Sequence, residues 1–154
     1  MIRPGLEEFR RLAIGHDLVP VCREVLADLE TPVSAFRKLA GAGDAALLES
    51  MEGGETWGRY SIIGCDPVLR FESRGREVRL ESERGVEIRE DDRPLRILDG
   101  VLAGMRTAPL PGLPSLAGGA IGFVCYDMVR RFERLPSAAR DDLGLPDARF
   151  AVFT

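Results

Sequence analysis

The sequence has one histidine and three widely separated cysteines, so several kinds of site are excluded at the outset. Only His16 could complete a Ser-His or Cys-His catalytic pair, and it lies in a glycine-containing turn where we expect no catalytic role. The cysteines are odd in number and none forms a C-x-x-C pair (Cys22, Cys65 and Cys125). Neither a disulfide framework nor a zinc site is therefore expected.

The sequence also lacks a basic excess and a long apolar run. The net charge of -4 provides no basic surface, so nucleic acid is not an expected partner. No apolar run approaches the roughly 20 residues that span a bilayer, and the charged N-terminus does not resemble a signal peptide. With 154 residues, 45% of them hydrophobic and 30% charged, we expect one globular cytoplasmic domain over residues 1–154.

Helical signals occur in four places, predicted as helices over residues 4–14, 31–40, 94–105 and 126–132. In the second, Thr31 is expected as the N-cap and Pro32 as the first helical residue. Strands are predicted over residues 18–27, 45–51, 59–64, 68–73, 77–81, 86–89, 118–124 and 148–154. The pattern indicates an α+β fold, with an antiparallel β-sandwich-like core and helices packed outside.

Four of these strands carry further expectations. Pro20 cannot donate to a ladder, so strand 18–27 is expected at an edge or with a bulge. Apolar residues alternate with charges over 77–89, which predicts one buried and one solvated face, with Val78, Leu80, Val86 and Ile88 on the buried one. Strand 118–124 is predicted to be buried, with glycines that allow another segment to approach closely.

The last strand ends the sequence abruptly. Phe150, Val152 and Phe153 need cover, and no further residues follow to supply it. We therefore predict that the chain is a fragment of a longer protein.

One group of polar residues stands out from the rest. An apolar run ends in Glu49 and Ser50, a glycine turn follows, and a second run begins with Arg59. Two antiparallel strands joined in this way can bring the three side chains together. A carboxylate, a hydroxyl and a guanidinium could then hold a zwitterion such as a free amino acid. The same residues also fit an ordinary hairpin with a surface Glu-Arg ion pair.

The other motifs favour packing or solvation. The glycines of 118–122 match neither a P-loop nor a dinucleotide fingerprint. Glu49 with Glu52 and the acidic run 90–92 are carboxylate pairs that could bind Mg²⁺ or transfer protons, yet neither implies a particular reaction. No catalytic or metal-binding residue is predicted.

Two stretches, Leu47–Ser50 and Trp57–Pro67, resemble the N-terminal region of anthranilate synthase component I. Three more resemble that region in the same order, over residues 19–36, 118–133 and 143–148. The resemblance implies an enzyme that converts chorismate to anthranilate and pyruvate, using Mg²⁺ and ammonia from a glutamine amidotransferase subunit (component II). The residues for chorismate and Mg²⁺ would lie in a C-terminal catalytic region absent here, so this chain alone is expected to be inactive.

For this chain, the resemblance implies much of the feedback site for L-tryptophan. Glu49 would meet the ligand's ammonium group, and Ser50 would hydrogen-bond the ligand. Arg59 would face its carboxylate or offset Glu49, while Leu48 and Pro32 would line the pocket. The rest of the pocket would come from the chain's own C-terminal catalytic region.

Two alternatives stay open at this stage. The first is component I of aminodeoxychorismate synthase, a homologue in folate synthesis in which tryptophan can be a structural ligand. The second is a stand-alone amino-acid-binding module, which would bind its ligand without any further chain.

Overall fold

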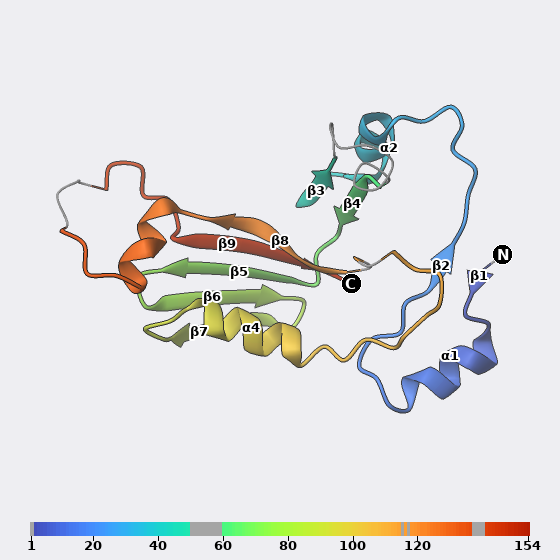
Figure 1. The fold of residues 1–154 in the computed structure, drawn as a ribbon, viewed down its shortest axis with the longest axis horizontal. Helices are drawn as coiled ribbons and strands as arrows, with labels where there is room; N and C mark the ends of the chain where they lie inside the picture. The colour runs from blue at the N-terminus through green and yellow to red at the C-terminus, as the bar shows by residue number, and fades with distance from the viewer. Residues whose placement is uncertain (1, 50–59, 115, 117, 137–140) are drawn as a thin grey trace. The chain divides into compact units, whose positions relative to one another are not determined.

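The computed structural model describes residues 2–49, 60–114, 116, 118–136 and 141–154, and the chain divides into two units. Figure 1 shows their helices and strands. The first unit comprises Met1–Pro67, Thr107–Ala117 and Phe153–Thr154. The second comprises Val68–Arg106 and Gly118–Val152. Each unit is therefore assembled from segments that are distant in the sequence. The described part contains helices and antiparallel sheets, which confirms the predicted α+β class.

A five-stranded sheet forms the second unit, in the order β7-β6-β5-β9-β8. Its strands are β5 (Leu69–Arg74), β6 (Glu77–Ser82), β7 (Gly85–Glu90), β8 (Gly119–Val124) and β9 (Ala148–Phe153). β5 pairs antiparallel with both β6 and β9. The last strand of the chain thus lies inside the sheet, between β5 and β8 (Figure 1).

One face of this sheet carries the hydrophobic core. Phe71 on β5 is opposite Leu80 on β6 and Phe150 on β9, so these side chains share a face. The helix α4 (Leu95–Ala103) packs its apolar side there, with Leu98 6% exposed. The buried residues of the cluster are Phe71, Val78, Leu80, Leu98, Met128, Ala148 and Val152. The helix predicted over residues 94–105 is therefore confirmed.

The opposite face of the sheet is charged. Glu72 and Arg74 form an ion pair at 3.0 Å, and Arg79 and Glu81 form another at 3.1 Å. Arg70, on the neighbouring strand, lies 3.9 Å from Glu81. These pairs form a polar surface over the middle strands, as the alternating pattern predicted.

The prediction for β7 was wrong. A two-residue turn joins Ser82 to its partner Gly85, so Glu87, and not a valine or isoleucine, lies opposite Leu80. Val86 and Ile88 therefore fall on the charged face, where they are 49% and 52% exposed. The length of the turn sets the register, and a register shifted by one residue reverses every side chain.

Asp147 joins several segments at one end of this sheet. Its carboxylate accepts a hydrogen bond from the Gly75 backbone N–H at 2.7 Å and lies 3.7 Å from Arg131. Its backbone N–H donates to the Ser73 carbonyl, and its own carbonyl accepts from the Cys125 N–H at 2.7 Å. Asp147 thereby ties the β5–β6 turn to the start of β9 and to the end of β8.

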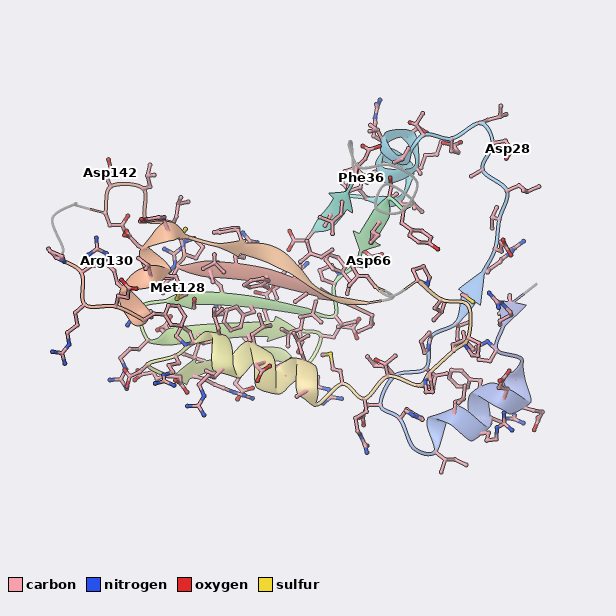
Figure 2. The ribbon with its side chains drawn as sticks, in the orientation of Figure 1. Asp28, Phe36, Asp66, Met128, Arg130 and Asp142 are labelled. Atoms are coloured by element: carbon pink, nitrogen blue, oxygen red, sulfur yellow. The ribbon has the colours of Figure 1, made fainter. Side chains whose placement is uncertain are left out.

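The short helix predicted near residue 126 is present as the 3-10 helix η1 (Tyr126–Arg131). Met128 on this helix is 2% exposed and belongs to the core cluster (Figure 2). Arg130 lies on the outer side, where its guanidinium donates to Asp127 at 3.0 Å.

In the first unit, α1 (Leu6–Ala13) confirms the first predicted helix. Two-residue strands β1 (Ile2–Arg3) and β2 (Cys22–Arg23) pair antiparallel. The predicted strand 18–27 is thus mostly wrong: outside β2, only Leu18 makes a bridge, with Thr107. Pro20 has no N–H to donate, which is consistent with an interruption at this point. The remaining elements are α2 (Pro32–Leu39), β3 (Ala45–Leu48) and β4 (Ile62–Cys65).

Two expectations about burial also need correction. Strand 118–124 was predicted to be buried, yet β8 is an edge strand in the described part of the chain, with Phe123 44% and Val124 46% exposed. The last strand was expected to lack cover, yet Val152 is 1% and Phe153 8% exposed. Both errors arise because sheet order cannot be read from local patterns.

Candidate functional site

The site predicted from the sequence falls on the helix α2 and the hairpin strands β3 and β4. β3 and β4 pair antiparallel, from Ala45 opposite Cys65 to Leu48 opposite Ile62. Within the first unit, α2 contacts both strands. Figure 2 labels Phe36, which lies on α2. Pro32 and Leu48 therefore belong to one helix-and-hairpin substructure.

The start of α2 is fixed by a capping box. The Thr31 hydroxyl accepts a hydrogen bond from the Ser34 backbone N–H at 3.1 Å. In return, the Thr31 backbone N–H donates to the Ser34 hydroxyl at 2.9 Å. Pro32 occupies the first helical position, where its missing N–H has no helical partner to lose. The predicted cap and start are both confirmed, and Pro32 is half-buried.

An ion pair holds the flank of this helix. Lys38 contacts the Glu30 carboxylate, and the Ser34 hydroxyl donates to the same carboxylate at 2.6 Å. The hydrogen bond from Lys38, followed by that from Ser34, lowers the pKa of Glu30. The two charges therefore pair with each other beside the start of α2.

Two of the predicted site residues lie at and directly after the end of β3. Leu48, the last residue of β3, is 42% exposed, and Glu49 directly after it is also exposed. Ser50 and Arg59 lie outside the described residues. The predicted grouping of Glu49, Ser50 and Arg59 thus stays a prediction, as do their contacts with a ligand.

Gly64 on β4 has a packing role that the sequence analysis did not identify. A Cβ at this position would lie 2.9 Å from the Phe153 ring, so only glycine leaves room for it. The sequence signal was present, because glycine within a strand marks a close approach. Local sequence does not say which residue approaches.

Other candidate chemistry is sparse in the described residues. No three histidine, cysteine, aspartate or glutamate side chains in residues 2–49, 60–114, 116, 118–136 and 141–154 cluster in a way that could hold a metal ion. The three cysteines are free thiols and half-buried. His16 Nδ1 lies 2.9 Å from the Leu12 carbonyl at the end of α1. None of the helices in the described part has the length and apolar character that crossing a membrane requires.

Comparison with known proteins shows that the chain is similar in sequence to several proteins that share one name. The chain is 40% identical over 154 residues to anthranilate synthase component 1 of Acetivibrio thermocellus, covering 100% of this chain and 31% of that protein. It is 49% identical over 153 residues to the Mycobacterium tuberculosis protein of that name, covering 96% and 30%. For the Pseudomonas aeruginosa protein the identity is 45% over 153 residues, covering 95% and 30%. No protein-family model matches the chain.

The chain therefore spans about a third of the length of the curated relatives that it matches, and they match it over almost all its residues. The similarity includes the helix-and-hairpin substructure, the five-stranded sheet and the segments between them. On this evidence the chain belongs to the anthranilate synthase component 1 family and corresponds to the N-terminal part of its members.

Proposed function

We propose that this chain is the N-terminal regulatory domain of an anthranilate synthase component 1, and that it carries much of a feedback site for L-tryptophan. The observation that carries the proposal is 36–49% identity over nearly the whole chain to proteins of that name. The complete protein would convert chorismate to anthranilate and pyruvate, a lyase reaction. Its ammonia would come from a glutamine amidotransferase subunit, component II.

Within this proposal, the feedback site lies at the hairpin tip and the start of α2. An exposed carboxylate at Glu49 is available for an ammonium group, and the exposed part of Leu48 offers apolar contact. The capping box fixes Pro32 at the start of α2, a helix that contacts both strands of the hairpin. Ser50 and Arg59 supply the hydroxyl and the guanidinium. The remaining contacts come from the C-terminal catalytic region, which also binds Mg²⁺ and chorismate. This chain alone therefore forms no anthranilate.

Inhibition would follow from linkage. A ligand that binds one arrangement of the two regions more tightly shifts the population toward that arrangement. If the favoured arrangement has a poorly formed chorismate site, tryptophan lowers the rate without touching the reacting atoms. Typical couplings of this kind change an affinity by about 5- to 150-fold.

The test is anthranilate formation by the complete protein from chorismate, Mg²⁺ and ammonia, with L-tryptophan titrated in. We expect the rate to fall as tryptophan rises. Ser50→Phe should raise the tryptophan concentration for half-inhibition at least about tenfold, with little loss of uninhibited activity. Glu49→Gln should act in the same direction, and Glu87→Gln, on the exposed strand β7, should leave inhibition unchanged.

Two results would contradict the proposal. Equal inhibition of Ser50→Phe and the parent would remove Ser50 from the site. Failure to form anthranilate, with a product that needs a separate lyase to yield 4-aminobenzoate, would favour the aminodeoxychorismate synthase alternative. Tryptophan would then be a structural ligand.

A further inference from the structure

The two edges of the five-stranded sheet are chemically different. β7 forms one edge and β8 the other in the described residues. β7 is exposed along its whole length and carries a Glu87–Arg89 ion pair at 2.7 Å. Charged side chains on an edge strand discourage another strand from pairing with it. The β7 edge is therefore protected in the usual way.

β8 has none of these protections. Its six residues, Gly119–Val124, include no charge and no proline. Phe123 and Val124 are adjacent, so they point to opposite faces of the strand, and both are nearly half exposed. A six-residue apolar edge of this kind is a template for strand addition.

The β8 edge is also held in place. A Cβ at Gly122 would lie 2.0 Å from the Arg149 carbonyl oxygen, so β8 and β9 approach at a point that only glycine allows. At the end of β8, the Cys125 backbone N–H donates to Asp147, and the Cys125 thiol donates to the Pro146 carbonyl at 3.1 Å. A strand fixed to its neighbour can accept a further strand without first being ordered, which lowers the cost of pairing.

From these observations we infer that the β8 edge pairs with a β-strand from the part of the longer protein that lies outside these 154 residues. The inference rests on the proposal that the chain is a domain of such a protein. The relatives that match this chain are about three times its length, so each of them has further chain beyond the matched region from which such a strand could come. The added strand should be uncharged where it lies against Phe123, because a charge would be desolvated there.

The experiment is hydrogen exchange on the complete protein, read peptide by peptide, with β7 as an internal reference. We expect the β8 backbone amides that face away from β9 to exchange at least about tenfold more slowly than exposed β7 amides, because added pairing protects them. Phe123→Lys should abolish this difference. The matched variant Ile88→Lys, at a half-exposed position on β7, should preserve it.

Three results would overturn the inference. The first is rapid exchange in β8, equal to that in β7. The second is protection that disappears on dilution, which would make a second copy of the protein the occupant. The third is protection that appears only when the amidotransferase subunit is added. The unmodified protein gives each readout, so a misfolded Phe123→Lys variant would not obscure it. Anthranilate formation is not measured here, so failure of this pairing and failure of the proposed function are distinguishable.

Discussion

The two units of the chain use their apolar residues differently. The second unit buries Phe71 and Val78 completely beneath α4. In the first unit, Leu26 is 89% and Leu29 98% exposed, and neither α1 nor α2 contains a fully buried residue. The second unit is thus stabilised by a hydrophobic core. The described part of the first relies more on local devices such as the capping box at Thr31. Stability within one chain is often uneven in this way.

The largest expected effect on stability distinguishes a core residue of the second unit from an exposed residue of the first. Phe71→Ala should lower the free energy of unfolding by about 3–5 kcal/mol, because it leaves a cavity in the core. Leu29→Ala, at an exposed position of the first unit, should change it by less than about 0.5 kcal/mol. Urea denaturation followed by circular dichroism measures both. Similar losses for the two variants would contradict the division into a core-stabilised unit and a locally stabilised one.

Alanine substitutions at two glycines of the second unit should change the free energy of unfolding in opposite directions. Gly122→Ala places a Cβ 2.0 Å from the Arg149 carbonyl oxygen and 2.7 Å from the Phe150 Cα. Because these are backbone atoms, which cannot move aside as a flexible side chain can, we expect the free energy of unfolding to fall by about 1–3 kcal/mol. Gly100 lies in α4, and nothing lies within 4 Å of a new Cβ there. Gly100→Ala should therefore raise the free energy of unfolding by about 0.5–1 kcal/mol, because alanine has the higher helix propensity. Thermal unfolding of the two variants tests this, and a stabilising Gly122→Ala would refute the close approach of β8 and β9.

The smallest effect concerns a surface ion pair in each unit. Lys38 lowers the pKa of Glu30 in the first unit, and Arg89 lowers that of Glu87 in the second, in both cases mainly by a hydrogen bond. A carboxyl pKa lowered by folding adds stability at neutral pH. That contribution is lost as the pH falls through the lowered pKa. Both pairs are exposed, so the contribution should also shrink in high salt.

Lys38→Met should therefore raise the pKa of Glu30 toward its ordinary value and leave that of Glu87 unchanged. Arg89→Met should do the reverse. An NMR titration of the carboxyl groups measures the pKa values of Glu30 and Glu87 in one experiment. The small stability difference between Lys38→Met and the parent should vanish at acid pH, and a difference that grew on acidification would contradict the assigned sign.

Local signals were reliable wherever the structure depends on neighbours in sequence. Thr31 and Pro32 predicted the start of α2, and Gly75, with φ of 60°, marks the turn predicted between β5 and β6. A cap or a tight turn is set by a few adjacent residues, and that information is present in the sequence. The family resemblance, and not a local pattern, named Pro32 and Leu48 as candidates; the structure places Pro32 at the start of α2, Leu48 at the end of β3 and Glu49 directly after it. The ligand-binding roles of all five residues, Pro32, Leu48, Glu49, Ser50 and Arg59, remain predictions.

The sequence by itself determined the α+β class, most element positions and, through resemblance, the family. Only the tertiary structure decided that the last strand lies inside the sheet, that β8 forms an edge, and that Val86 and Ile88 face the charged side. The physical reason is that strand order and register depend on hydrogen bonds between segments far apart in the chain. An apolar strand such as β8 has the same sequence pattern whether it is flanked on one side or on two.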